Sequence, residues 1–202
     1  MIAIIDYGAG NIFSVKNALD YLGLESALVS DKEAVQNADA VILPGVGAFE
    51  DAARKLRESG LSEIVCDMAK SGKPLMGICL GMQLLFEKSY EYGCHTGLGL
   101  IPGSVVPMEG KLPPELKIPH IGWNALLLKK SCSLFENIQE GDCVYFVHSF
   151  YADQCDDYVA ATAEYGIELT AAVAKENIMG CQFHPEKSGA VGLTILKSFA
   201  QM

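Results

Sequence analysis

Two short segments of the sequence carry residues that could do nucleophilic chemistry. In the first, Gly77-Ile78-Cys79-Leu80-Gly81, a cysteine stands between glycines. A turn of this kind between a strand and a helix exposes its central side chain above a sheet, and the glycines let strand and helix pack closely. Cys79 is therefore a candidate nucleophile, and the amide of Leu80 a candidate donor to an oxyanion. Taken alone, the pattern also fits a small buried cysteine in a core.

The second segment is His184-Pro185-Glu186. In an extended chain, residues two apart face the same side and proline keeps its neighbour extended, so His184 and Glu186 are predicted to project together. A cysteine nucleophile needs an imidazole base and a third group that fixes the tautomer of the imidazole. The two segments together predict a Cys79, His184 and Glu186 triad, against the alternative of a solvated strand end.

The elements that must position these residues alternate in the first half of the sequence. Short apolar runs predict strands at residues 3–5, 27–29, 40–43 and 75–78. Helical spacing of apolar residues predicts helices at 11–22, 32–38, 49–68 with an interruption near Gly60, and 80–87. This alternation predicts an α/β fold with a doubly wound, mainly parallel central sheet flanked by helices.

The second half has a different pattern, in which strand-like runs are separated mainly by short turns. These runs cover residues 105–108, 123–128, 143–148, 158–164, 169–174 and 178–183. We expect them to form additional antiparallel hairpins packed beside the parallel sheet. Residues 191–199 have helical periodicity and predict a C-terminal helix. With no linker or repeat, residues 1–202 are expected to form a single domain.

Composition limits the classes of partner. The chain has 202 residues, of which 50% are hydrophobic, and a formal net charge of −10, which disfavours a nucleic-acid partner. No apolar run approaches the length of a membrane span, and the start of the chain resembles a first strand more than a signal peptide. The seven cysteines are irregularly spaced, which favours a reducing cytoplasm. The histidines have no metal-ligand spacing, so neither a metal nor another cofactor is expected.

Residues 77–83 together with His184-Pro185-Glu186 resemble the class I (triad) glutamine amidotransferase family. Further segments follow in the family's order without a major insertion, at residues 6–11, 43–49, 120–124, 145–149 and 182–189. They are similar to the branch of this family that supplies ammonia in histidine biosynthesis. The resemblance extends from residue 2 to about residue 200, so it covers nearly the whole chain.

The resemblance implies a role for each residue that matches a family motif. Cys79 would attack the side-chain amide of glutamine, His184 would protonate the departing ammonia and then activate water, and Glu186 would orient His184. The oxyanion hole would be formed by Leu80, Val46 and Gly47. The residues expected to bind glutamine are Gln83, Gly45, Ser149 and Phe150. Gln83 could instead be a polar residue on the exposed side of its helix, and His120 and His148 are interpreted as structural.

The resemblance also implies a partner. The chain offers no convincing site for an ammonia acceptor, so we expect a heterodimer with a cyclase subunit that has a (β/α)₈ barrel, and a poor glutaminase in its absence. Asn11, Trp123 and Lys187 are the expected interface residues, because an indole and a long cation are suitable anchors. The alternatives are that Trp123 fills the core and that Lys187 is solvated.

Three other functions remain open at this stage. The glutaminase of pyridoxal phosphate synthase has the same Cys, His and Glu triad, although residues 6–11 and 44–47 fit the histidine branch better. A redox sensor could use Cys79 as a reactive thiol on the same fold, but it would need no oriented base. A cysteine peptidase would need an open groove for an extended chain, and the sequence does not define a groove.

Overall fold

The fold is built on one sheet that takes strands from both halves of the chain. The computed structural model describes residues 1–202, and its largest sheet has eight strands in the order β2-β1-β3-β4-β14-β13-β12-β9. The strands from β2 to β14 pair in parallel, and the remaining three continue the sheet in antiparallel pairing. In sheet order they are β2 (Ser26–Val29), β1 (Ile2–Ile5), β3 (Ala40–Leu43), β4 (Leu75–Ile78), β14 (Ile178–Cys181), β13 (Glu168–Lys175), β12 (Val159–Glu164) and β9 (Leu127–Leu128).

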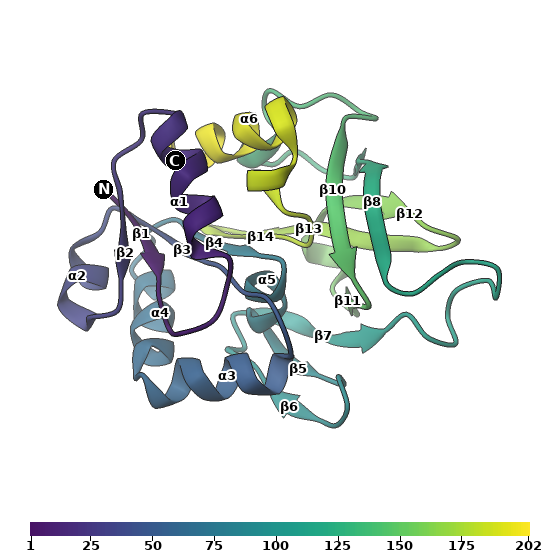
Figure 1. Ribbon diagram of the computed structural model, residues 1–202, viewed down its shortest axis with the longest axis horizontal. Helices are drawn as coiled ribbons and strands as arrows, with labels where there is room; N and C mark the ends of the chain where they lie inside the picture. The colour runs from purple at the N-terminus through teal and green to yellow at the C-terminus, as the bar shows by residue number, and fades with distance from the viewer.

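Helices cover both faces of the parallel part, which confirms the predicted α/β architecture. On one face lie α1 (Ile12–Tyr21) and α6 (Gly189–Phe199). The other face carries α2 (Lys32–Asn37), α3 (Phe49–Glu58), α4 (Leu61–Lys70) and α5 (Leu80–Leu84). Figure 1 shows the two helical layers on opposite sides of the strands. Each face of the sheet therefore has its own apolar core.

The sequence of β1 explains why both faces of the central sheet must be covered by helices. Ala3 and Ile5 pack into the core beneath α3 and α4, whereas Ile2 and Ile4 pack into the core beneath α1 and α6. Successive side chains of a strand point to opposite faces, so a strand that is apolar at every position must be buried on both. The predicted interruption of the long helix is also present, since Gly60 has φ 69° and separates α3 from α4.

The predicted helix over residues 80–87 is wrong at its C-terminal end. α5 stops at Leu84, and residues Phe86–Ser89 form strand β5. This strand pairs in parallel with β7 (Ile101–Pro107), whose backbone supplies the partners that another turn of helix would otherwise have provided. β5 belongs to a four-stranded sheet of order β11-β7-β5-β6, in which β6 is His95–Thr96 and β11 is Phe150–Asp153.

The hairpins of the second half lie partly inside the central sheet and not only beside it. β8 (His120–Ala125) and β10 (Cys143–His148) form a separate antiparallel pair, as predicted. In contrast, β12 and β13 extend the central sheet, and β14 inserts in parallel beside β4. The remaining elements are the short 3-10 helices η1 (Ser133–Phe135), η2 (Asp156–Tyr158) and η3 (Pro185–Lys187).

The strand order brings the candidate chemistry to one edge of the sheet. β3, β4 and β14 are parallel neighbours, so the segments that follow them, starting at Pro44, Cys79 and Gln182, leave the sheet at the same edge. None of the helices has the length and apolar character that a bilayer crossing requires.

Candidate active site

Cys79 occupies a strained turn between β4 and α5. Its φ of 54° and ψ of −112° lie in a region that side chains other than glycine rarely adopt. The flanking glycines explain how the turn fits. A Cβ added to Gly81 would lie 1.8 Å from the Leu43 carbonyl oxygen, and one added to Gly77 would lie 2.6 Å from the Gly81 carbonyl oxygen. Backbone contact on both sides therefore holds the nucleophile turn in place.

His184 and Glu186 make the predicted contact, but not for the predicted reason. His184 Nδ1 lies 2.8 Å from Glu186 Oε1, and both side chains are buried. His184 is extended, whereas Pro185–Lys187 is a 3-10 helix, so the two residues do not follow a common strand. Ser188 secures this turn, because its hydroxyl donates to the His184 carbonyl oxygen over 2.6 Å and accepts from the Tyr145 amide over 3.0 Å.

The electrostatics of His184 favour the imidazolium. Burial lowers the pKa of this imidazole, but contacts with Cys79 and Glu186 raise it, and the net value is about 9. Because Nδ1 faces Glu186, the other ring nitrogen, Nε2, is the one available to the Cys79 sulfur. A protonated imidazole beside a sulfur can deliver a proton to a leaving group, and after that transfer it can act as a base.

A pocket of about 430 Å³ opens directly over this pair. It brings together Cys79 and His184 with most of the residues that the sequence predicted to bind substrate or stabilise the oxyanion. The predicted residues that line it are Val46, Gly47, Leu80, Gln83, Ser149, Phe150 and Lys187. Gly45, Asn11 and Trp123 do not line the pocket, and Glu186 lies behind His184.

Gly45 has a packing reason to be glycine, although it does not reach the pocket. A Cβ at this position would lie 2.9 Å from the Gly81 amide nitrogen and 3.0 Å from Leu80 Cβ. The backbone of the 44–48 segment therefore lies against the first turn of α5. Gly47 has φ 95° with open space around it, so it is glycine for its conformation. Together these two glycines bring the 46–47 peptide to the rim of the Cys79 pocket.

Gln83 is 5% exposed, so the interpretation that it is a surface polar residue is wrong. Its Nε2 donates to the Phe150 carbonyl oxygen over 3.1 Å and to Gln182 Oε1 over 2.9 Å. Gln182 Nε2 in turn lies 3.8 Å from Cys79 Sγ. Gln83 is therefore anchored between the pocket wall and a second glutamine that contacts the nucleophile.

Four further residues lie around the pocket, of which sequence reasoning interpreted His148 as structural and gave the other three no role. Glu91, Tyr92 and His148 line it, and Gln182 lies beneath it. Glu91 Oε2 accepts from the Phe49 amide over 2.8 Å and so caps α3, while Tyr92 meets the Phe150 ring edge-on at 5.9 Å. Glu91 and Tyr92 were missed because they follow β5, whose first two residues were assigned to a helix and whose last two were assigned to no element. The burial of His148 could have been found from strand alternation with Phe146.

Of the three expected interface residues, Lys187 lines the pocket and Trp123 and Asn11 do not. Trp123 is 58% exposed, so the alternative that it fills the core is wrong. It lies in β8 close to Ile121, which is also 58% exposed, and Ile118, which is 41% exposed. Lys187 is exposed at the pocket rim, and Asn11 accepts a hydrogen bond from Ser14 at the start of α1.

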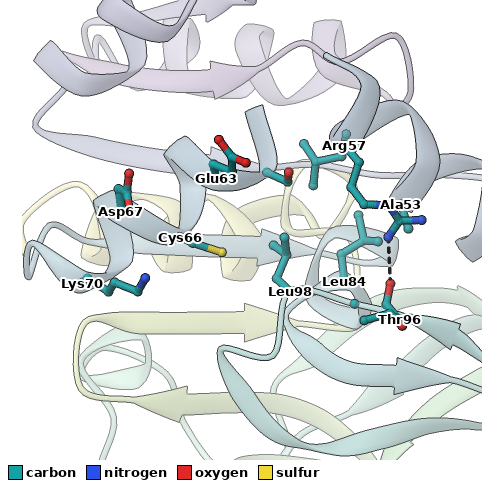
Figure 2. Close-up of a pocket in the computed structure, with 12 residues that line it drawn as sticks. Ala53, Arg57, Glu63, Cys66, Asp67, Lys70, Leu84, Thr96 and Leu98 are labelled. Carbon is teal, nitrogen blue, oxygen red and sulfur yellow. Dashed lines mark hydrogen bonds between the residues drawn. The ribbon is translucent and has the colours of Figure 1, made fainter. Parts of the chain in front are cut away.

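A second pocket, of about 290 Å³, lies between α3, α4 and the segment around Thr96. Figure 2 shows Cys66 and Lys70 on one side and Leu84 and Leu98 on the floor. Arg57 closes one end by donating to the Thr96 carbonyl oxygen over 3.1 Å. No histidine lines this pocket, so its thiol lacks the imidazole base that the predicted triad requires.

Comparisons with known proteins agree with this geometry. The chain is 51% identical to "Imidazole glycerol phosphate synthase subunit HisH" of Caldanaerobacter subterraneus subsp. tengcongensis, over 100% of this chain and 98% of that protein. It is 50% identical to the protein of the same name from Geobacter metallireducens, over 98% and 97%.

Among solved structures, PurLQS from Thermotoga maritima has a TM-score of 0.77 at 22% identity, covering 99% of this chain and 97% of that one, which shows a shared fold. A crystal structure of a glutamine amidotransferase gives the same TM-score at 21% identity, with both chains covered completely. The family model of class I glutamine amidotransferases matches residues 3–201. The chain therefore belongs to the class I glutamine amidotransferase family.

Proposed function

We propose that this chain is the glutaminase subunit of an imidazole glycerol phosphate synthase in histidine biosynthesis. It hydrolyses glutamine to glutamate and ammonia, and the ammonia passes to a cyclase subunit that makes imidazole glycerol phosphate and AICAR. The observation that carries the proposal is the buried His184 and Glu186 pair, held beside a strained cysteine at the base of a pocket. The relatives that share half of its residues over their whole length support the pathway.

The first half of the reaction forms a thioester. Cys79 Sγ attacks the side-chain amide carbon of glutamine, and the carbonyl oxygen takes the displaced electron pair. The imidazolium of His184, favoured by its raised pKa, gives its proton to the nitrogen as the carbon–nitrogen bond breaks. Ammonia leaves, and the acyl group stays on sulfur. Glu186 fixes the tautomer and orientation of His184 through its contact at Nδ1.

The second half releases glutamate. His184, now neutral, takes a proton from a water molecule that attacks the thioester carbon. The carbon–sulfur bond breaks with its electron pair going to sulfur, His184 keeps the proton from water and is again an imidazolium, and glutamate departs. Both tetrahedral intermediates carry a negative oxygen, for which we assign two donors. One is the amide of Leu80 and the other comes from the Val46 and Gly47 segment, which borders the same pocket.

Substrate recognition falls to the opposite wall of the pocket. We assign the backbone of Ser149 and Phe150, together with Gln83, to the bound glutamine, since all three line the pocket. Gly45 acts indirectly, because its packing against Gly81 sets the distance between the 44–48 segment and Cys79. Residues 1–202 act as one domain, because strands from both halves of the chain pair within the central sheet.

The partner is a cyclase with a (β/α)₈ barrel. We infer that it docks over the pocket mouth, where the exposed side chains of Trp123 and Lys187 and the nearby Asn11 supply the contacts. Ammonia in water at neutral pH is largely protonated and no longer nucleophilic, so a covered path beside the pocket is chemically useful. All seven cysteines are unpaired, which supports a location in the reducing cytoplasm.

The redox-sensor alternative is not favoured by the site. A sensor thiol needs no oriented imidazole, yet the buried Glu186 carboxylate contacts His184 Nδ1. The pyridoxal phosphate synthase alternative shares the triad, and the curated relatives favour the histidine branch over it.

The rate of glutamate production, measured in three preparations, tests the proposed function. We expect slow turnover by the isolated chain, faster turnover with the cyclase, and the fastest with the cyclase and its phosphoribosyl-type ligand. The cyclase and its ligand would raise turnover through the 44–47 segment. An amide of this segment would complete the oxyanion hole in one backbone conformation, and the partner would favour that conformation. If the isolated chain produces glutamate as fast as the liganded complex, the partner does not activate the site. If the chain binds no such cyclase, the assignment to the histidine pathway is wrong.

A further inference from the structure

A chain of hydrogen bonds leads inward from the exposed β8 and β10 hairpin. It begins at Asn124, whose Nδ2 lies 3.3 Å from His120 Nε2. His120 Nδ1 lies 3.1 Å from His148 Nε2. His148 Nδ1 then lies 2.9 Å from the Phe150 carbonyl oxygen, in the wall of the glutamine pocket. Three side chains therefore connect the surface hairpin to the backbone that faces the substrate.

A second set of bonds continues from Phe150 to the nucleophile. Gln83 Nε2 donates to the Phe150 carbonyl oxygen and to Gln182 Oε1, over 3.1 Å and 2.9 Å. Gln182 Nε2 then reaches Cys79 Sγ at 3.8 Å. Gln182 has no exposed surface and Gln83 has 5%, so neither amide can replace a lost partner with water at low cost.

The donors and acceptors admit only one arrangement. The Phe150 carbonyl oxygen can only accept, so His148 carries its proton on Nδ1 and accepts at Nε2. His120 must then donate from Nδ1 and accept from Asn124 at Nε2. Both imidazoles are therefore neutral.

Burial favours the same protonation state. The net pKa of His148 is about 3, because burial and the neighbouring His120 and His184 lower it by more than the hydrogen bond to Phe150 raises it, and burial also lowers the pKa of His120. The rings of Phe146 and Tyr165 stack on His120 and complete its apolar surroundings. Neither imidazole is therefore protonated near neutral pH, and the hydrogen bonds of His120 and His148 are retained there.

We propose that His148 and Gln182 are positioning residues for the glutaminase reaction: His148 fixes the Ser149 and Phe150 wall, and Gln182 fixes the Cys79 sulfur. Asn124 and His120 tie both to the β8 face. Asn124 follows Trp123 directly, so a partner that docks on this face would lie against the residue at which the series of hydrogen bonds begins. This inference deepens the proposed function and rests on it.

A matched pair of variants tests His148 in the complex with the cyclase. His148→Leu removes both ring nitrogens, whereas His148→Asn keeps an amide donor close to the Nδ1 position. We expect His148→Leu to lower kcat/KM for glutamine roughly 10- to 100-fold, mainly through KM, because the wall loses a buried partner. His148→Asn should recover most of this loss. Ammonia-dependent synthesis by the same complex should not change, since it bypasses the pocket.

Gln182→Met, a substitution of similar length without polar atoms, tests the other end. We expect it to lower kcat more than KM and to slow the alkylation of Cys79 by iodoacetamide in the complex, measured by mass spectrometry of the Cys79-containing peptide after digestion, since the other free cysteines also react. The limbs of the pH-rate profile should stay where they are in the unmodified protein, because burial lowers the pKa of His148 to about 3 and also lowers the pKa of His120.

The results separate the inference from the function on which it rests. If kcat/KM for His148→Leu stays within about threefold of the unmodified value, or if His148→Asn is no better than His148→Leu, the positioning role of His148 is wrong. If His148→Leu does not fold, the Gln182→Met measurement decides, and unchanged kcat with unchanged alkylation overturns the inference. A lack of glutamine-dependent synthesis by the unmodified complex would instead overturn the proposed function.

Discussion

The two walls of the pocket are held in different ways. One wall contains the 44–48 segment and the turn at Cys79, and backbone contact holds it, with Gly45 and Gly81 too close to their neighbours to carry a side chain. The other wall contains residues 147–150 and the His184 turn, and side-chain hydrogen bonds hold it. The first wall should therefore fail when atoms are added, and the second when polar atoms are removed.

The largest effect is expected at the junction of the walls. Cys79→Ala should abolish glutamine-dependent synthesis while leaving ammonia-dependent synthesis by the complex intact, because only the nucleophile is lost. Comparing the two reactions in one preparation of the complex measures this. Glutaminase turnover near the unmodified rate would mean that Cys79 is not the nucleophile.

Glu186→Gln tests the wall that depends on polar atoms. The amide keeps the shape of the carboxylate but removes the charge that supports the imidazolium of His184. We expect glutamine binding to survive while turnover falls by roughly one to several powers of ten. Steady-state kcat and KM in the complex check this. An unchanged kcat would show that the carboxylate does not act through His184.

Gly81→Ala tests the wall that depends on backbone contact. The added Cβ would meet the Leu43 carbonyl oxygen at 1.8 Å, so β3 and α5 would have to separate. We expect a loss of about 3 kcal/mol or more in the free energy of unfolding, measured by urea denaturation. Gly23→Ala is the control, because Gly23 has φ 70° but open space, and it should cost only about 1 kcal/mol. Equal losses would mean that close approach is not what holds this wall.

The smallest effect expected is a pH dependence of stability. The folded pKa of His184 is about 9, above its ordinary value of 6.5, so its contribution is complete below pH 6.5 and is lost as pH rises through 9. The shift is worth at most about 3 kcal/mol. The difference in unfolding free energy between the unmodified chain and His184→Asn should therefore shrink between pH 6 and pH 10. A constant difference would mean that the pKa is not raised in the folded state.

The same contrast explains what the sequence could predict. The turn at Cys79 was predictable because its glycines are local and each has a steric reason. The contact between His184 and Glu186 was predicted from extended geometry, which the 3-10 helix at Pro185–Lys187 contradicts, so a correct pair followed from an incorrect local structure. The parallel strands of the first half were predicted because continuous apolar runs are characteristic of doubly covered sheets.

The remaining parts depend on contacts between distant segments. β5 was not predicted, and its first two residues were assigned to a helix, because its partner β7 is separated from it in sequence and no local pattern indicates the pairing. The hydrogen bonds of Gln182 and His148 join residues from four separate segments, so neither residue type nor spacing could reveal them. Trp123 is exposed in a hairpin, and apolarity alone could not distinguish that position from a core position.

The insertion of β14 between β4 and β13 bears on how the enzyme is made. The amide of Cys79 donates to the Cys181 carbonyl oxygen over 2.8 Å, so Cys79 and His184 follow adjacent strands that are about a hundred residues apart in the chain. During synthesis on the ribosome, the first four strands emerge with a thiol and no imidazole beside it. The reactive pair is completed only when one of the last strands to be translated enters the middle of the sheet. A truncated chain that ends before β14 therefore lacks His184 and cannot hydrolyse glutamine, so it releases no ammonia before it can bind a partner.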